Sequence, residues 1–264
     1  MAINSPVYGG AKPTLDCLCS LRPLNPEHVT PSEALAMSQL TREGVLAALQ
    51  RSPDASAVAQ VLNPVLEGWS RSPEQATWIL SRLAKGHLPT SLLVMEVMRM
   101  QNVQVNTVHM NTLLHAYARR GNWLAAARLL DDMALQEVSQ DIISFSSVIT
   151  ACEKGHAWEF AMEMLEHMQV AKVQQDIICM NSAISACEKA GCWAAALSLL
   201  ATSQEMAVRQ DTVTFNSCIS ACEKASEWSR ALHLLGSMSG RLVDRLGPGG
   251  ILLFCLQQIC QAGL

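Results

Sequence analysis

The sequence predicts an all-α protein, an α-solenoid of stacked helix–turn–helix units. Three observations predict it: a strict 35-residue period, helical spacing of apolar residues within each period, and small residues at recurring positions. The period is clearest in four of the six tryptophans, which stand 35 residues apart at Trp123, Trp158, Trp193 and Trp228. A fixed period of roughly 20–50 residues is typical of a repeat array.

Small and apolar residues keep the same register as the tryptophans. Three positions recur in every unit: Ala116, Ala151, Ala186 and Ala221; Ala126, Ala161, Ala196 and Ala231; Leu130, Leu165, Leu200 and Leu235. Because small side chains let two helices approach to about 8–10 Å, the alanine columns favour close packing of helices.

One unit contains two helices, as residues 141–175 illustrate. Ile142 to Lys154 places apolar residues at helical spacing, and the pattern resumes from Ala157 to Val170. Gly155-His156 separates the two segments and predicts a turn. Neither helix can bury its apolar stripe alone, so we expect neighbouring units to stack.

The opening of each unit resembles that of the pentatricopeptide repeat, a 35-residue helix–turn–helix whose pattern begins Asp-Val-Thr-Tyr-Asn-Thr-Leu-Ile. The openings read Asn106-Thr-Val-His-Met-Asn111-Thr, Asp141-Ile-Ile-Ser-Phe-Ser146-Ser, Asp176-Ile-Ile-Cys-Met-Asn181-Ser and Asp211-Thr-Val-Thr-Phe-Asn216-Ser. Tetratricopeptide repeats differ, with a period of roughly 34 residues and another signature. The resemblance covers about half of the chain and implies a right-handed superhelix with units 107–141, 142–176, 177–211 and 212–246.

Outside these four units the template weakens. Residues 1–31 are rich in proline and predict a disordered leader. Residues 32–70 form either a helical cap or decayed repeats. Residues 71–106 form a degenerate repeat: Gly86 aligns with Gly121 and Ala76 replaces the Asn111-type residue, so we expect this unit to pack without reading a base. Residues 247–264 form an irregular apolar tail, compatible with a cap, a truncated unit or a contact surface.

Composition bears on compartment and on metal sites. Ten cysteines without a secretory segment predict reduced thiols and an intracellular protein. Cys152, Cys187 and Cys222 fall in one column spread along the array, so we interpret them as small core residues and expect no metal site and no cofactor. The resemblance implies a mitochondrion or chloroplast, although the leader lacks the arginines of a transit peptide, which leaves cytoplasm or nucleus open. The apolar run 251–256 is too short to span a membrane, which takes about 20 residues.

The sequence contains no convincing catalytic set. Its seven histidines are scattered without paired metal-ligand spacing. We interpret His109, His156 and His233 as turn or surface residues. The Glu-Lys pairs at 153–154, 188–189 and 223–224 recur with the repeat, which favours a role shared by the array over one active site. We therefore expect the chain not to be an enzyme.

The resemblance implies single-stranded RNA as the ligand, with one base bound by each unit. Pentatricopeptide repeats read a base with the fifth residue of a unit and its closing residue. Carried over, the base-reading residues are Asn111 with Asp141, Ser146 with Asp176, Asn181 with Asp211, and Asn216, whose closing position is Leu246. Asn with Asp resembles the family's choice of uridine and Ser with Asp its choice of guanosine. The implied target core is U-G-U.

Two further columns are candidates for RNA contacts. The apolar column, Val108, Ile143, Ile178 and Val213, matches the residues that wedge between bases in the family; helix packing is the alternative. The cation column, Arg119, Lys154, Lys189 and Lys224, supplies one charge per unit. These cations would contact phosphates, interact with the helix dipole at about 0.3–1 kcal/mol each, or do both.

Charge and energetics limit this prediction. Residues 107–246 carry 11 Lys and Arg against 15 Asp and Glu, a net charge of −4, whereas most nucleic-acid binders are basic. Three readable units at about 1–3 kcal/mol each stand against an association cost of about 4–15 kcal/mol, so we expect weak binding by this chain alone. The alternative is a protein-interaction scaffold without RNA binding, with a partner on the outer helices or the C-terminal apolar tail.

Overall fold

The computed structural model describes residues 42–52, 54–71, 73–206, 208 and 210–237. Every regular element among these residues is helical, which confirms the predicted all-α class. The helices are α2 (Arg42–Arg51), α3 (Ala55–Arg71), α4 (Pro73–Gly86), α5 (Leu88–Met100), α6 (Thr107–Arg120), α7 (Trp123–Leu135), α8 (Ile142–Lys154), α9 (Trp158–Val170), α10 (Ile177–Ala190), α11 (Trp193–Glu205) and α12 (Thr212–Lys224). A further helix covers residues 228–237. The predicted leader and tail lie outside the described residues.

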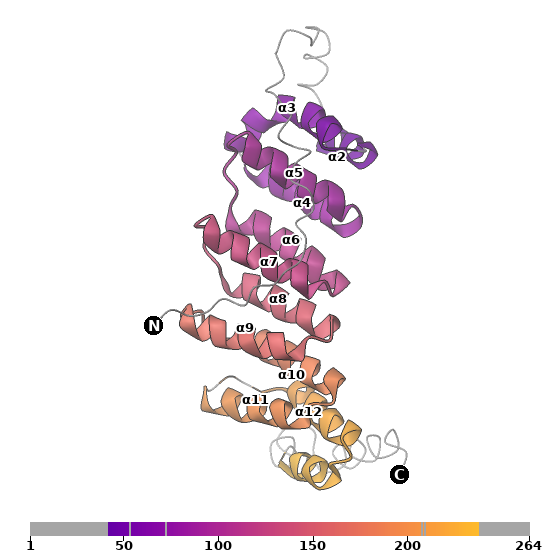
Figure 1. Cartoon of the computed structure of the whole chain (residues 1–264), viewed down its shortest axis with the longest axis vertical. Helices are drawn as coiled ribbons and strands as arrows, with labels where there is room; N and C mark the ends of the chain where they lie inside the picture. Colours follow the sequence, from indigo (N-terminus) through magenta and orange to yellow (C-terminus); the bar gives the residue numbers. More distant parts are fainter. Residues whose placement is uncertain (1–41, 53, 72, 207, 209, 238–264) are drawn as a thin grey trace.

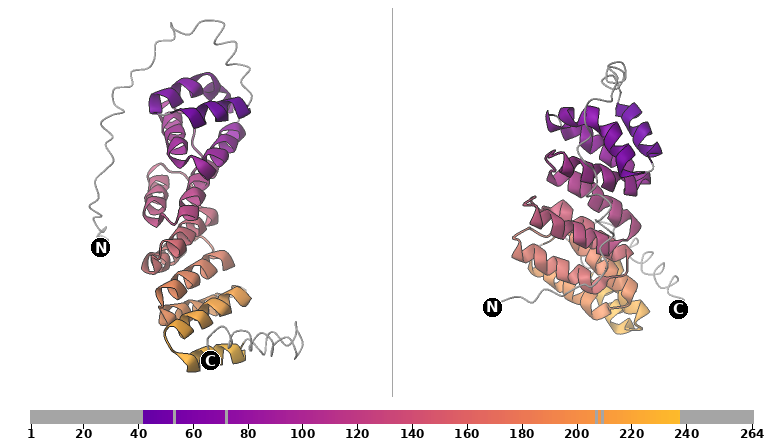
Figure 2. Two further views of the ribbon diagram at one scale, coloured as in Figure 1. Left: turned by 90° about the vertical axis from the view of Figure 1, so that its right-hand side faces the viewer. Right: turned by 45° about the horizontal axis from the view of Figure 1, so that its top comes forward.

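The helices follow one another in pairs along the long axis of the molecule (Figure 1). The first helices of successive units, α4, α6, α8, α10 and α12, pack on one another and form one layer. Each second helix packs between its own first helix and the next, so the second helices form the other layer (Figure 2). At one end of the stack, α2 contacts α4 and α3 contacts α5. The predicted α-solenoid is thereby confirmed.

Two recurring side-chain contacts fix the link between units. A capping residue precedes each of α6, α8, α10 and α12 and accepts a hydrogen bond from the N–H three residues further on. These caps are Asn106, Asp141, Asp176 and Asp211, and such caps contribute about 1 kcal/mol each. A glutamine before each aspartate donates to a leucine carbonyl of the second helix, in the pairs Gln140–Leu130, Gln175–Leu165 and Gln210–Leu200. The loop between units is therefore tied at both ends.

The recurring small residues form the interior between the helices. All eight alanines of the two predicted columns are buried. Cys152, Cys187 and Cys222 are also buried, which confirms that they are small core residues. Burial raises the pKa of the Cys152 thiol to about 12 and that of Cys187 to about 11, so both thiols are protonated near neutral pH.

Two absences hold for the described residues. No three His, Cys, Asp or Glu side chains in this part of the chain are placed to hold a metal ion. None of its helices has both the length and the hydropathy that crossing a membrane requires.

The predicted turn at Gly155 is a site of close approach between two units. A Cβ atom on Gly155 would lie 2.5 Å from the Trp123 ring and 2.6 Å from the carbonyl oxygen of Gly121. Gly121 ends α6 in the left-handed conformation, with φ +67°, where glycine has no steric cost. Backbone therefore meets backbone where the units of α6 and α8 touch.

The register predicted for residues 71–106 is wrong for the first helix. α4 begins at Pro73 and α6 at Thr107, which are 34 residues apart, whereas the second helices α5 and α7 begin 35 residues apart. The missing residue is in the turn, since His87 alone links α4 to α5. Gly86 belongs to α4, so aligning it with Gly121 misplaces every residue of α4 by one position.

The corrected register changes which residue of α4 faces outward. Ala76 is fully buried, as Met110 is in α6, so Ala76 does not replace Asn111. Thr77 takes the place of Asn111 and is only partly buried. The alignment of Ala76 with Asn111, on which the prediction that this unit packs without reading a base depends, is therefore wrong.

His109 is the second correction. Predicted as a turn or surface residue, it is 1% exposed. Its Nδ1 accepts a hydrogen bond from the Asn106 N–H at 3.4 Å, and its Nε2 lies 3.4 Å from the Pro73 carbonyl oxygen. Burial lowers the pKa of His109, opposed only in part by the Pro73 carbonyl. His109 therefore joins α4 to α6 as a neutral imidazole near pH 7.

Candidate functional site

The predicted base-reading residues Asn111 and Asp141 contact each other. The Asn111 Nδ2 donates to the two carboxylate oxygens of Asp141, at 3.0 and 3.2 Å. The Ser144 hydroxyl donates to the Asn111 Oδ1 at 2.7 Å. Asn111 comes from α6, and the other two residues come from the N-terminus of α8. The three side chains form a polar cluster at the junction of two units.

The same cluster recurs between α10 and α12. The Asn181 Nδ2 donates to Asp211 at 3.2 and 3.4 Å, and the Thr214 hydroxyl donates to the Asn181 Oδ1 at 2.6 Å. Burial by itself would raise the pKa of Asp211, but hydrogen bonds from the Thr214 N–H, the Thr214 hydroxyl and the Asn181 amide outweigh it and lower the pKa. Asp141 is affected in the same way. Both aspartates are therefore carboxylates near neutral pH.

The junction between α8 and α10 lacks this cluster. No hydrogen bond joins the predicted pair Ser146 and Asp176, although the structure describes both. The Ser146 hydroxyl donates to the Ile143 carbonyl at 3.2 Å, and the Asp176 Oδ1 accepts from the Cys179 N–H at 2.9 Å. The Asp176 carboxylate also forms a side-chain hydrogen bond with Cys179. Ser146 and Asp176 therefore each bond to their own helix and not across the junction between α8 and α10.

The fourth predicted base-reading residue, Asn216, is described without the closing residue of its unit. Its Oδ1 is buried and has no hydrogen-bond partner there. The closing residue of its unit, Leu246, lies outside the described part of the chain. The structure therefore places Asn216 in the same column without defining its surroundings.

The apolar column is exposed in every unit. Its four side chains lie in the first turn of the first helices and are 54%, 45%, 58% and 55% exposed at Val108, Ile143, Ile178 and Val213. Helix packing therefore covers only about half of each side chain. Four large aliphatic groups at equal spacing form a surface stripe, and repeated apolar exposure of this kind favours a binding surface.

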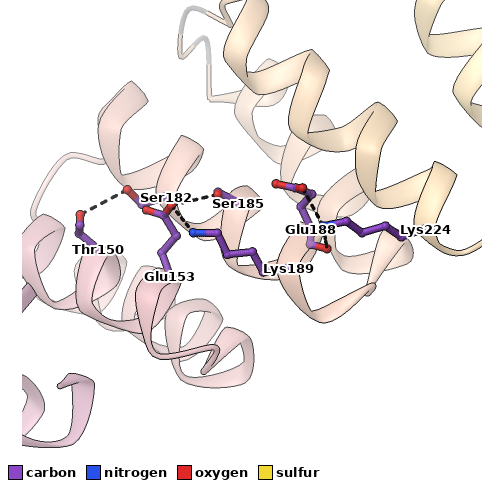
Figure 3. Close-up of polar contacts among 7 residues, drawn as sticks. All are labelled: Thr150, Glu153, Ser182, Ser185, Glu188, Lys189 and Lys224. Carbon is purple, nitrogen blue, oxygen red and sulfur yellow. Dashed lines mark hydrogen bonds and ion pairs between the residues drawn. The ribbon is translucent and has the colours of Figure 1, made fainter. Parts of the chain in front are cut away.

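Two members of the cation column are engaged in ion pairs (Figure 3). The Lys189 Nζ lies 2.8 Å from the Glu153 carboxylate, and the Lys224 Nζ lies 2.9 Å from that of Glu188. Serines add to both contacts: Ser185 donates to Glu153 at 3.0 Å and Ser220 to Glu188 at 3.1 Å. Each lysine thus reaches back to the preceding first helix, and a phosphate would compete with a carboxylate for it.

The other two cations have no such partner. Arg119 and Lys154 are exposed and form no ion pair with a described residue. The partner of Lys189 lies 36 residues earlier, and the residue 36 before Lys154 is Ala118. The cation column is therefore unpaired at α6 and α8 and paired at α10 and α12.

The sequence analysis missed the third residue of each unit. Ser144 and Thr214 hold the amides of Asn111 and Asn181, and both were seen only as part of the repeat opening. The sequence contained a signal: a hydroxyl residue, Ser144 or Thr214, follows the units of Asn111 and Asn181, whereas Cys179 follows the unit of Ser146. The third residue of one unit thus matches the fifth residue of the unit before it.

Family models match parts of the predicted repeat region. The PPR repeat model matches residues 143–173 and 213–241, and the PPR repeat family model matches residues 105–154. No curated protein matches the sequence.

Solved structures share the fold. The PPR domain of Arabidopsis thaliana protein-only RNase P 1, solved with tRNA, has a TM-score of 0.58 at 15% identity and covers 70% of this chain and 96% of its own. The pentatricopeptide repeat protein PPR10, solved with an 18-nucleotide psaJ RNA element, has a TM-score of 0.54 at 20% identity. That match covers 90% of this chain and 42% of PPR10, so the chain spans less than half of PPR10's length. Residues 105–173 and 213–241 are therefore pentatricopeptide repeats by their family models, and the solved structures show the same helical-solenoid fold.

Proposed function

We propose that this chain binds single-stranded RNA along its first-helix layer, one base per unit, and acts in RNA processing or organelle gene expression. The observation that carries the proposal is the recurrence, in successive units, of a polar reading residue beside an exposed aliphatic side chain. The two solved relatives named above hold tRNA and an 18-nucleotide RNA, which supports RNA as the ligand class. The proposed core sequence is U-G-U.

The asparagine clusters leave hydrogen-bonding capacity for a base. An asparagine amide has two N–H donors and an oxygen with two lone pairs. At Asn111, Nδ2 donates to both carboxylate oxygens of Asp141 and Oδ1 accepts from Ser144, so Oδ1 keeps one lone pair for a base. Uracil presents an N3–H donor beside carbonyl acceptors and therefore complements such an amide. Because Asp141 and Ser144 fix its orientation, the amide is prepared to discriminate among bases.

The middle unit suits a different base. Ser146 and Asp176 are not hydrogen-bonded to each other, and the Asp176 carboxylate bonds to Cys179 at the start of its own helix. Guanine presents an N1–H and an exocyclic amino group, two donors that complement a carboxylate. The different contacts at this junction therefore support guanosine between two uridines.

The two remaining columns supply affinity that does not depend on sequence. A base held between Val108 and Ile143 would cover the exposed aliphatic surface of both. Arg119 and Lys154 can approach phosphates directly, whereas Lys189 and Lys224 must first leave Glu153 and Glu188. We therefore expect the strongest phosphate contacts at the units of α6 and α8.

A second candidate function, protein binding without RNA, is favoured by charge and by exposed apolar residues elsewhere. Residues 107–246 have a net charge of −4. On the second helices, Leu135 and Val170 are 81% and 83% exposed. Leu135 and Val170 belong to second helices, whereas Asn111, Ser146 and Asn181 belong to first helices, so a protein partner on the second helices would not need these three residues.

Fluorescence anisotropy with short RNAs, titrated with salt, tests the two functions. RNA binding predicts tighter binding of UGU-containing RNA than of poly-A, and a salt slope of up to about −3 from roughly −0.7 per phosphate. Asn181→Ser should move the preference at the third base from U toward G, because it copies the pair at Ser146 and Asp176. Asn181→Gln is the matched control, since it keeps an amide but displaces it.

The outcomes separate the candidates. A flat salt response together with equal binding of UGU and poly-A would leave only the scaffold function. A salt-dependent response without base preference would retain RNA binding and exclude one-base-per-unit reading.

A further inference from the structure

A pocket of about 330 Å³ lies in the second-helix layer, between α7 and α9. The two helices follow one another in that layer (Figure 1), and each packs on α8 rather than extensively on the other. Three buried side chains, Leu130, Phe145 and Met164, line the pocket. Phe160 also lines it and is only partly buried, with its ring centroid 5.2 Å from that of Trp123. The pocket is therefore an apolar depression in the layer that does not carry the predicted base-reading residues.

The rim of this pocket adds exposed apolar surface and a carboxylate. Val170, at the end of α9, lines the pocket and is 83% exposed. Asp131 of α7 and His167 of α9 also line it, and both are exposed. Partial burial of its carboxyl and the charge of Asp132 raise the pKa of Asp131, and His167 offsets this only in part. A cation at the rim would therefore meet a carboxylate that forms no ion pair with a described residue.

Charge separates the second helices at this pocket from the first helices beside them. The helices α7 and α9 together carry five acids and one arginine: Asp131, Asp132, Glu159, Glu163, Glu166 and Arg128. The helices α6 and α8 carry three cations and one acid: Arg119, Arg120, Lys154 and Glu153. None of the five acids forms an ion pair with a described residue. Because unpaired acids repel phosphate and attract cations, the surface of α7 and α9 disfavours RNA and favours a basic partner.

The same depression recurs two units later with different chemistry. A pocket of about 450 Å³ lies between α11 and residues 228–237. Equivalent positions line both pockets, among them the pairs Leu130–Leu200, Asp131–Ala201, Phe160–Arg230 and Met164–Leu234. The Arg230 guanidinium lies over the Trp193 ring, 4.4 Å from its centroid, and lies 3.6 Å from the Glu227 carboxylate. The fold thus supplies an apolar depression at both places, whereas the pocket between α7 and α9 is aromatic and acidic and the later one is cationic.

We propose that the pocket between α7 and α9 docks a basic segment of a partner protein. An aromatic or large aliphatic side chain of the partner inserts over Phe145 and Met164, and a neighbouring lysine or arginine pairs with Asp131. A large anchor in a pocket with polar groups at the rim is typical of protein interfaces. The proposal goes beyond RNA binding and does not rest on it, because the predicted base-reading residues on α6, α8 and α10 belong to the first-helix layer. The two surfaces could be occupied at the same time.

Selection of random peptides by the full chain, followed by fluorescence anisotropy with labelled synthetic copies of the enriched peptides, tests this pocket. We expect the enriched peptides to carry lysine or arginine next to an aromatic residue or leucine. Asp131→Ala and Phe160→Ala should each weaken their binding about ten-fold. Both variants install the residue that an equivalent position carries in another unit, Ala201 and Ala195. Glu205→Ala is the matched control, since it removes an exposed acid from α11 outside the lining of the pocket and should leave binding unchanged.

The results distinguish this pocket from other binding modes. A selection that enriches no binding peptide, or only peptides without a cation, would overturn the proposal. Equal binding to wild type, Asp131→Ala and Phe160→Ala would do so as well, and so would displacement of the peptides by UGU-containing RNA, which would place them on the first-helix layer. Self-association of the chain that Asp131→Ala abolishes, measured by sedimentation, would assign the pocket to a second copy in place of another protein. Thermal unfolding checks that the variants are folded, and Asp131→Asn removes the charge with less change of shape if Asp131→Ala is unstable.

Discussion

The junctions on the two sides of α8 are stabilised at opposite ends of their helices. Between α6 and α8, hydrogen bonds of Asn111 with Asp141 and Ser144 lie at the N-terminus of α8, and no ion pair joins the C-terminal ends. Between α8 and α10, the Glu153–Lys189 pair lies at the C-terminal ends, while Ser146 and Asp176 remain apart. The backbone repeats at every junction, whereas each of these two polar contacts is present at some junctions and absent from others; the junction between α10 and α12 has both.

This difference determines which side chains at each junction join neighbouring units and which form no contact between units. The first junction uses the predicted base-reading residues Asn111 and Asp141 as structural contacts, and Arg119 and Lys154 form no ion pair with a described residue. The second junction uses Lys189 as a structural contact, and its predicted base-reading residues Ser146 and Asp176 are not hydrogen-bonded to each other. Under the proposed RNA binding, a strand would therefore meet unpaired cations at the first junction and a lysine engaged with Glu153 at the second.

The largest expected effect on the free energy of unfolding comes from a substitution at the close contact between the C-terminal ends of α6 and α8. Gly155→Ala would place a methyl group 2.5 Å from the Trp123 ring and should lower the free energy of unfolding by about 1–3 kcal/mol. Urea denaturation measures it. Gly68→Ala is the control, because nothing lies within 4 Å of that Cβ, and it should be neutral or stabilising by up to about 1 kcal/mol. Equal effects of both variants would contradict the proposed close packing.

A smaller effect is expected at the N-terminal ends. Asn111→Ala removes the donor to Asp141 and the acceptor of Ser144, and should cost about 1–2 kcal/mol. Ser146→Ala, at the same position one unit later, should change stability by no more than about 0.5 kcal/mol, because Ser146 bonds only within its own helix. Chemical denaturation of the two variants in parallel compares the junctions directly. A larger loss for Ser146→Ala would reverse the comparison.

Of the two lysines Lys154 and Lys189, Lys189 should matter more for stability and Lys154 more for RNA binding. Lys189→Met breaks a partly exposed ion pair and should cost about 0.2–1 kcal/mol, whereas Lys154→Met should have almost no effect on stability. For RNA binding, Lys154→Met should reduce the salt slope by about 0.7 and Lys189→Met by less. Thermal unfolding and salt titration of both variants test this. Equal slopes for the two would show that the Glu153 contact does not withhold Lys189 from phosphate.

The regular part of the fold could be predicted from the sequence because each unit repeats the same spacing of apolar and small residues. Ile142 to Lys154 was predicted as a helix, and α8 has those bounds. The alanine columns and Cys152 proved to be core, since their spacing reports which side of a helix is buried. These features depend on contacts within one unit or on identical contacts between units.

What the sequence did not predict depends on how particular units meet. The Lys189–Glu153 pair joins residues 36 positions apart, and its formation depends on the angle between α8 and α10, which the period does not give. The displaced register of α4 arose because one residue is missing from the turn at His87, while Gly86 preserved a misleading match to Gly121. Irregularities in a repeat require the helix ends to be located, and a column of identical residues does not locate them.

The junction between α4 and α6 extends the comparison and carries the smallest expected effect, a change in pH dependence. His109 stands where Ser144 stands one unit later, and burial lowers its pKa in the folded chain. In the unfolded chain a histidine has a pKa of about 6.5, so the unfolded chain binds the proton more readily than the folded chain does. The free energy of unfolding should fall as pH decreases from about 7 through that value.

His109→Ser should weaken this loss of stability, because serine has no proton to gain and Ser144 shows that it completes the same capping box. Urea denaturation at pH 7.5 and at about pH 5 measures the difference between the two variants. Ser144→His is the reciprocal variant and should introduce the same pH dependence between α6 and α8. If His109→Ser keeps the full wild-type dependence, the imidazole is not the group that makes the first junction sensitive to pH. The contrast among the three junctions would then concern hydrogen bonds and ion pairs alone.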